Sequence, residues 1–424
     1  MVGAVIARQL LGRGPGVYTI FLAGAFLTVA TGALSVAGAE SALAGAAPVL
    51  LFLFSLFLFA GALEKAGALD HLARWIVGRA DRAENLPAVV FVGFGVVSAF
   101  LVNDALVLIG VPLVLSVARR VRTDPRPLLL TLAFAVTVGS VLTPFGNPQN
   151  LLVAVGSGLA DPVTTFLRYL LLPTVVNLAV GAWYLRRVFG PGVAPGRDRI
   201  DDGLEEAPPL LPTGGWGGRL YRSPVLYVFP GTLLVAITLD LASAISHGPS
   251  VPLWETTGAG AILLLLLSPG RRPIVERVDW TILLLFVGLF VVVASAVRGG
   301  VIGSVESHFP IAGPGAPIAS LAAIMGTSVL GAQVVSNVPW VGLQIPLLAG
   351  LGYGPGTPVA WMALAAASTL AGNVTLLGAA SNLIVVELAE KEGVPIRLGT
   401  FVRYGLPLSA VCLAVVFALL ALGL

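Results

Sequence analysis

The carboxylate with the clearest chemical role is Asp104, which lies in the middle of an apolar stretch running from residue 86 to residue 119. A charged group in apolar surroundings is costly unless it has a partner, so an acid at such a position indicates a functional site. Asp104 could release and take up a proton, or it could bind Na⁺. The structural alternative is a helix cap at the end of a hairpin, because aspartate is a preferred N-cap residue.

Amides and hydroxyls form a second set of candidates, because they gather at four points where apolar stretches are interrupted. Amide groups both donate and accept hydrogen bonds, so they can hold an oxygen-rich solute, or coordinate Na⁺ through oxygen, without a fixed charge. Together with Asp104, the candidate solute-binding residues are Asn103, Thr143, Asn147, Gln149, Asn150, Ser336, Asn337, Asn373, Thr375, Ser381 and Asn382. Capping of broken helices explains any single one equally well, but repetition of the whole set favours binding. Asn103, Asp104 and Asn337 are the candidates for a coupling ion, H⁺ or Na⁺.

The scarcity of cysteine and histidine excludes several other kinds of site. The single cysteine, Cys412, rules out a disulfide framework or a thiolate metal site, and the three histidines lie far apart in sequence. The single cysteine has no histidine near it in sequence and the histidines are few and scattered, so we expect neither an enzyme nor a cofactor, and no metal beyond Na⁺. No lysine or arginine lies at any of the four breaks, which favours a small neutral or weakly charged solute over a polyanion.

The composition requires lipid as the solvent for most of the surface. Of 424 residues, 57% are hydrophobic and only 11% are charged, against about 25% charged in soluble domains. Disorder is excluded, because disordered chains combine low hydrophobicity with high charge. We therefore interpret the net charge of +3 as a determinant of membrane orientation, not as a sign of nucleic-acid binding.

Apolar runs of about 20 residues, the length needed to cross a bilayer, predict an all-α polytopic membrane protein. Seven plain spans are expected at 16–37, 45–64, 163–188, 223–245, 252–268, 279–298 and 399–423. Two further spans, 128–158 and 358–390, are broken helices, and two stretches, 86–119 and 314–350, are expected to be re-entrant helical hairpins. With nine crossings, 22 of the 24 lysine and arginine residues fall on one side. The positive-inside rule makes that side the cytoplasm, which places the N-terminus inside and the C-terminus outside the cell inner membrane.

The two halves of the chain match at a nearly constant offset. Asn103 pairs with Asn337 in this match, and Asn150 pairs with Asn382. Because five crossings separate matching elements, the second repeat is expected to be inverted. We assign residues 1–188 to an N-terminal repeat, 189–222 to a cytoplasmic linker, and 223–424 to a connecting helix and the C-terminal repeat. Inverted repeats with broken helices at corresponding positions are typical of secondary transporters with a site at the midplane, whereas a channel would need a continuous polar lining.

The chain resembles the ion transporter superfamily in four motifs, VNDALVLIGVPLVL, TPFGNPQNLLV, VSNVPWVGLQIPLL and STLAGNVTLLGAASNLIVVELA. The resemblance covers roughly residues 45–420, and its nearest branches are the arsenite-permease-like and the bacterial anion-permease, or citrate-transporter-type, groups. It implies that two re-entrant hairpins and two broken helices form the site, with solute or Na⁺ bound by Asn103, Thr143, Asn150, Ser336, Asn337, Thr375, Ser381 and Asn382. It also implies a homodimer with an elevator-like transport domain, and in the arsenite branch a cytoplasmic ATPase subunit as partner.

The hairpin motifs rank the possible solutes. The dicarboxylate branch has Ser-Asn-Thr at both tips, whereas this chain reads Val102-Asn103-Asp104 and Ser336-Asn337-Val338. The first tip resembles the arsenite branch, whose substrate is a neutral trihydroxide. We therefore expect a transporter that moves a small inorganic or organic anion or oxyanion, arsenite-like in the first instance, coupled to H⁺ or Na⁺ by alternating access. The alternatives are a Na⁺/H⁺ antiporter that uses Asp104, although its usual second acid is absent from the motif, and a di- or tricarboxylate symporter.

Overall fold

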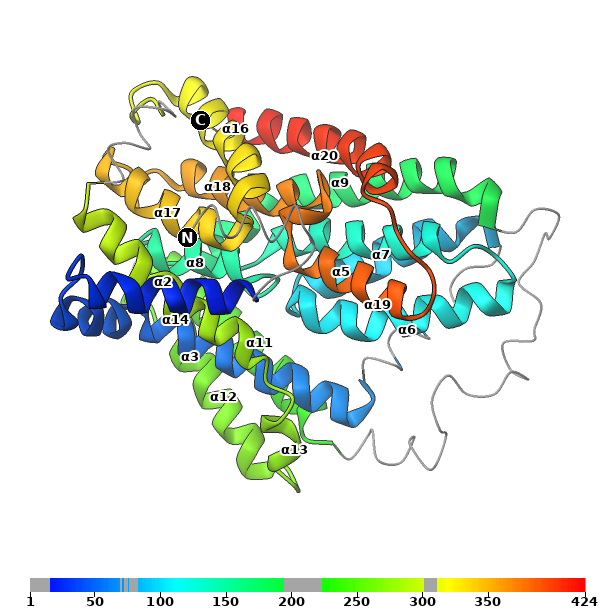
Figure 1. Cartoon of the computed structure of the whole chain (residues 1–424), viewed down its shortest axis with the longest axis horizontal. Coiled ribbons are helices and arrows are strands. Elements are labelled where there is room, and N and C mark those ends of the chain that lie inside the picture. The colour runs from blue at the N-terminus through cyan, green and yellow to red at the C-terminus, as the bar shows by residue number, and fades with distance from the viewer. Residues whose placement is uncertain are drawn as a thin grey trace.

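The computed structural model describes residues 16–68, 71, 75, 83–193, 223–246, 248–300 and 311–423. Every regular element among these residues is a helix, as expected from the apolar sequence. The helices form two groups, which Figure 1 shows as a long horizontal array and a second cluster at the lower left of the view.

The first group contains six helices, each of which precedes the predicted hairpin of its own half. They are α2 (Val17–Ala30), α3 (Val36–Ala66), α11 (Val225–Ser246), α12 (Leu253–Leu267), α13 (Arg272–Val275) and α14 (Trp280–Arg298). Helix α14 packs on α2 and α3, while α12 packs on α3 and α11. Local signals set the helix ends: the Ser35 hydroxyl accepts a hydrogen bond from the Gly38 amide at the start of α3, and Gly67, with φ +71°, follows its end.

The second group contains the predicted hairpins and broken helices, in the same order in both halves. In the first half these are α5 (Leu86–Ser98), α6 (Asn103–Val121), α7 (Arg126–Gly139), α8 (Pro148–Gly156) and α9 (Pro162–Val193). In the second half they are α16 (Pro317–Val335), α17 (Asn337–Gly350), α18 (Pro358–Leu370), α19 (Ala380–Lys391) and α20 (Leu398–Ala421). The helix start at Asn103 corresponds to the one at Asn337, and the start at Pro148 to the one at Ala380, with the offsets expected from the sequence.

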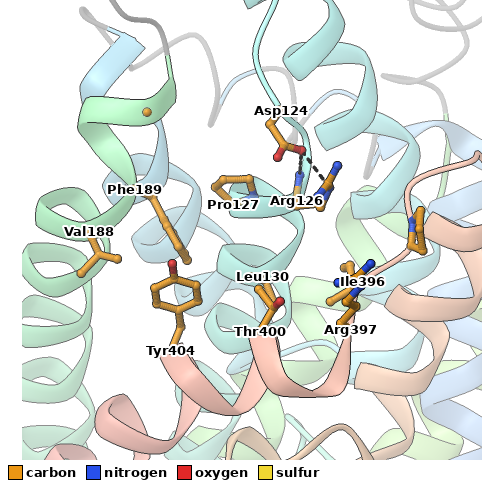
Figure 2. A pocket seen from close by; sticks show the side chains of 12 residues that line it. Asp124, Arg126, Pro127, Leu130, Val188, Phe189, Ile396, Arg397, Thr400 and Tyr404 are labelled. Carbon is orange, nitrogen blue, oxygen red and sulfur yellow. Dashed lines mark hydrogen bonds and ion pairs between the residues drawn. The ribbon is translucent and has the colours of Figure 1, made fainter.

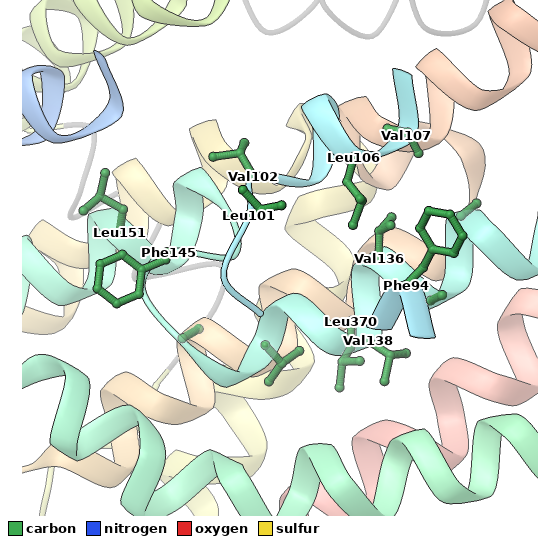
Figure 3. Packing of buried hydrophobic residues seen from close by; sticks show 14 of the residues in the cluster. Phe94, Leu101, Val102, Leu106, Val107, Val136, Val138, Phe145, Leu151 and Leu370 are labelled. Atoms are coloured by element: carbon green, nitrogen blue, oxygen red, sulfur yellow. The ribbon is translucent and has the colours of Figure 1, made fainter. Parts of the chain in front are cut away.

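Helices α7 and α18 form the centre of this second group. Every residue from Leu128 to Gly139 is buried, as is every residue from Val359 to Leu370. A helix that is apolar on all sides must be enclosed by other helices. Figure 3 shows Phe94 of α5 beside Val136 of α7, and Leu370 of α18 beside Val138 of α7. Since both helices break at their C-terminal ends, the polar breaks that follow them are carried into the protein interior.

The last helices of the two halves, α9 and α20, lie side by side along one edge of the array (Figure 1). Their contacts run in opposite directions along the chain. Tyr169 lies beside Gly423, the Asn177 amide donates to the Cys412 carbonyl at 3.3 Å, and the Tyr184 hydroxyl donates to the Tyr404 carbonyl at 3.4 Å. The two matching helices are therefore antiparallel.

Among the described residues, six helices are long and apolar enough to cross a bilayer, namely α3, α9, α11, α14, α16 and α20. Helix α16, the first arm of the predicted second hairpin, is one of them, so re-entry of the hairpins stays a prediction. Residues 189–193, expected in the linker, form the end of α9, while residues 194–222 lie outside the described part of the chain.

Candidate functional site

The first break is built by two asparagines. Helix α7 tightens into a 3₁₀ turn, Ser140–Leu142, and α8 restarts at Pro148. Asn147 caps α8, because its Oδ1 accepts from the Asn150 amide at 2.8 Å. The Asn150 side chain donates to the carbonyls of Ser140, Val141 and Thr143 at 2.9, 3.2 and 3.1 Å. A broken helix end leaves carbonyls without intrahelical partners, so both asparagines stabilise the break.

The tip of the first hairpin, at the start of α6, lies directly against this break. The Thr143 hydroxyl donates to the Ala99 carbonyl. The Asn103 amide is best satisfied with its nitrogen donating to the Val136 and Gly146 carbonyls, both at 3.1 Å, and its oxygen accepting from the Ser140 hydroxyl at 3.2 Å. Predicted site residues from two separate sequence motifs are thus brought together.

Asp104 is buried in the first turn of α6, with 7% of its surface exposed. Within the described residues its carboxylate makes no hydrogen bond, although the partial positive charge of the helix N-terminus lies close to it. Asp279, which caps α14 by accepting from the Ile282 amide at 3.1 Å, acts on Asp104 electrostatically. Sequence reasoning missed this second acid, because it lies in the other half of the chain, far from Asp104 in sequence.

The second break repeats the backbone arrangement of the first. The Asn382 side chain donates to the Gly372 carbonyl at 2.6 Å, and this pair matches Asn150 and Ser140 of the first half. The Gly378 amide donates to the Thr375 carbonyl at 3.2 Å, as the Gly146 amide does to the Thr143 carbonyl at 3.4 Å. The sequence match therefore reflects equivalent local structure. Ser381 is buried in the first turn of α19.

The second hairpin tip differs from the first. Asn337, the counterpart of Asn103, keeps its amide local, with Oδ1 accepting from the Val338 amide at 3.0 Å. The contact to the break comes instead from Gln333 on α16. Its oxygen accepts from the Thr375 hydroxyl at 2.6 Å, and its nitrogen donates to the Ala371 carbonyl at 2.9 Å. Gln333 was not among the predicted residues, yet it occupies the position that matches Ala99, where the Thr143 hydroxyl binds.

Thr369, a second residue that sequence reasoning missed, joins the two halves. Its hydroxyl donates to the Asn150 Oδ1 at 3.1 Å. It also accepts from the side-chain nitrogens of Asn147 and Gln149, each at 3.3 Å. Thr369 is fully buried in α18, so the first break is linked through it to the helix that leads into the second.

The two breaks differ in how completely their amides are paired. At the first break, the side-chain oxygens of Asn147 and Asn150 both accept hydrogen bonds. At the second break, Asn373 and Asn382 use their nitrogens, on the carbonyls of Phe134 and Gly372, while their buried oxygens have no hydrogen-bond partner among the described residues. Unpaired buried acceptors are costly and rare in native proteins, so these two oxygens are available to a donor or a cation.

Comparison with known proteins identifies membrane transporters of similar sequence. The profile of a family described as citrate transporter matches residues 10–371. An uncharacterized transporter of Mycobacterium bovis is 29% identical over 381 residues, which cover 86% of this chain and 83% of the relative. A silicon efflux transporter of Oryza sativa subsp. japonica is 26% identical over 432 residues, covering 87% and 85%. An inner membrane protein of Escherichia coli K12 is 28% identical over 364 residues, covering 85% and 83%.

A solved structure shows the same fold. The YdaH transporter of Alcanivorax borkumensis, described as having an unusual topology, matches with a TM-score of 0.64 over 96% of this chain and 98% of that chain. At 18% identity this likeness concerns the fold alone. The family match spans far more than half of the residues, and the relatives are transporters, not enzymes. The chain therefore belongs to the citrate transporter family of the ion transporter superfamily.

Proposed function

We propose that the protein is a secondary active transporter of a small, uncharged or weakly charged, oxygen-rich solute, and that Asp104 carries the coupling ion. The observation that supports this most is the pairing of the amides. The second break offers two buried, unpaired amide oxygens, while the first break is closed by its own hydrogen bonds. A solute with several hydroxyl groups would donate to those oxygens, and no cationic side chain at the breaks is required.

This solute class fits two of the resemblances. Arsenite and dissolved silicon are both uncharged polyhydroxides at neutral pH, and one relative is a silicon efflux transporter. Citrate carries up to three negative charges, which a site of amides and hydroxyls would have to balance with helix dipoles alone. An arsenite-like polyhydroxide is therefore the first candidate solute and a carboxylate is the last, despite the description of the family.

A Na⁺/H⁺ antiporter is the second candidate function, and Asp279 is the observation that favours it. Two carboxylates that repel each other can exchange protons for cations, because a bound cation relieves the repulsion. In this function Asp104 and Asp279 would hold Na⁺ or H⁺ in turn, without any other solute.

Transport by the purified full chain in proteoliposomes tests both functions. We expect uptake of arsenite or silicic acid, dependent on an imposed H⁺ or Na⁺ gradient, in the wild type and in Glu387→Gln, a control at an exposed carboxylate of α19. Asp104→Asn should keep its fold but lose at least tenfold in gradient-driven uptake. Gradient-driven uptake by Asp104→Asn at the wild-type rate would refute the coupling role. Sodium-driven proton movement without any solute flux would replace the first function by the second.

A further inference from the structure

A pocket of about 570 Å³ lies away from the solute site, at one end of the second helix group. It is enclosed by the N-terminal end of α7, the C-terminal end of α9 and the N-terminal end of α20 (Figure 2). None of the residues that line it takes part in the breaks or the hairpin tips. The ligand of this pocket is therefore expected to differ from the transported solute.

One side of the pocket is basic. Arg126 is the first residue of α7, and Arg397 is the N-cap residue of α20. Asp124 pairs with Arg126 at 3.3 Å, whereas Arg397 forms no ion pair with any described residue. The Asp124 carboxylate also accepts from the Arg126 backbone amide at 3.1 Å at the start of α7. The start of α20 has no side-chain cap, so the amides of its first turn add partial positive charge. With two arginines and one aspartate among its lining residues, the pocket favours an anion.

The other side of the pocket is apolar. Figure 2 shows Phe189 and Tyr404 facing each other, and their rings meet edge to face with centroids 4.7 Å apart. Leu130 and Val188 extend this wall, and Val188 is 39% exposed. A pocket with arginines at one side and a partly open apolar wall at the other matches an amphiphile better than an inorganic anion.

The position of the pocket along the long helices indicates how deep it lies in the bilayer. Helix α9 has 32 residues and is therefore about 48 Å long, well above the roughly 30 Å of a hydrocarbon core. The pocket lies at the C-terminal end of α9 and at the N-terminal end of α20, both of which are long enough to cross a membrane. It therefore lies at the level of the lipid headgroups, whichever way the protein is oriented. Basic pockets between helices at this level are typical sites for anionic headgroups.

We propose that this pocket binds one anionic phospholipid, with its phosphate between Arg126 and Arg397 and an acyl chain along Val188 and Phe189. The bound lipid would join α7, α9 and α20 at one end and would stabilise the group of helices that carries both breaks. This inference does not depend on the identity of the transported solute.

The test uses the delipidated full chain in detergent, with native mass spectrometry and thermal unfolding as readouts. We expect phosphatidylglycerol to bind one molecule tightly and to raise the apparent Tm of the wild type. Arg271→Gln should behave identically, because Arg271 is exposed and lies outside the pocket. In Arg126→Gln/Arg397→Gln, the affinity for phosphatidylglycerol should fall at least tenfold. Phosphatidylcholine should bind far more weakly than phosphatidylglycerol to the wild type.

Three outcomes would overturn the proposal. The first is that the double variant retains phosphatidylglycerol as well as Arg271→Gln does. The second is that the wild type binds phosphatidylcholine as tightly as phosphatidylglycerol. The third is that glycerol phosphate raises the Tm of the wild type as much as phosphatidylglycerol does, which would indicate a site for a soluble anion. If the double variant does not fold, Val188→Glu provides the same test. It keeps both arginines but places an acid on the exposed wall, so phosphatidylglycerol binding should be lost there too, and its retention would refute the proposed site.

Discussion

Ser336 holds the second hairpin tip in a backbone conformation that is nearly exclusive to glycine, with φ +71° and ψ 160°. A residue with a side chain in this region stores about 1–3 kcal/mol of strain. Ser336→Gly should therefore raise the free energy of unfolding by about 1 kcal/mol, whereas Ser336→Ala should not. Thermal unfolding of both variants in the same detergent measures the difference.

The same two variants also test whether the Ser336 hydroxyl contacts the solute. Both lack the hydroxyl, and only one relieves the strain. If the hydroxyl binds the solute, uptake falls equally in both, although their stabilities differ. A glycine variant no more stable than the alanine variant would show that the strained conformation is absent.

Gln333 is expected to position the second break by linking Thr375 and Ala371 to α16. Gln333→Ala removes the hydrogen bonds to Thr375 and Ala371, each worth about 1 kcal/mol, and should raise the KM for uptake about five- to thirty-fold. Thr375→Val removes the same link from the other side. The double variant should cost little more than Gln333→Ala alone, because that change already removes the link to Thr375. Additive effects would show that the two side chains act separately.

The residues that sequence reasoning found and missed differ in their surroundings. Asn103, Asn150 and Asn382 follow helix-breaking or polar signals in apolar segments, so their type and place were conspicuous. Gln333 and Thr369 lie inside helices, where nothing in the sequence marks them, and only the packing of α16 and α18 brings them to the breaks. Asp279 looks in the sequence like an ordinary helix cap. Its electrostatic effect on Asp104 depends on tertiary structure, which a single sequence does not reveal.

At the scale of the elements, the two breaks rely on one glycine each. A Cβ atom at Gly146 would lie 2.6 Å from the Ser140 carbonyl oxygen, and one at Gly378 would lie 2.6 Å from the Ala371 carbonyl oxygen. Gly146→Ala and Gly378→Ala should therefore each destabilise the protein by about 1–3 kcal/mol. At the control position, Gly350, a Cβ atom meets nothing within 4 Å. Melting temperatures and expression yields compare the three variants, and tolerance of alanine at either break would contradict their equivalence.

Helix boundaries were predictable wherever the chain carries a local signal. The prolines at 144 and 148 require a break in the first half, and α8 indeed starts at Pro148. The second half lacks prolines there, yet α19 starts at the matching residue, Ala380. The boundary between the expected spans 16–37 and 45–64 was wrong, because α2 ends at Ala30 and α3 already begins at Val36. Because apolar residues lie on both sides of that turn, hydropathy by itself does not locate the turn.

At the scale of the whole molecule, the antiparallel contact of α9 and α20 supports an inverted repeat. These two helices occupy matching positions in the two halves, and Asn177 meets Cys412, its counterpart in the second half, near the middle of both helices. Equivalent residues meet in this way where a two-fold axis passes between antiparallel helices. Parallel repeats would instead place matching helices in the same direction.

Cysteine labelling tests this inversion in the membrane. The native Cys412 is fully buried, so Cys412→Ala provides a background without reactive thiols. Arg168 and Arg403 are matching, exposed residues, and inverted repeats require them to lie on opposite sides. In intact cells, an impermeant maleimide should label Arg168→Cys but not Arg403→Cys, with Arg298→Cys and Arg271→Cys as outside and inside references. Labelling of Arg168→Cys and Arg403→Cys from the same side would exclude inversion, and with it a site placed on a two-fold axis in the membrane plane.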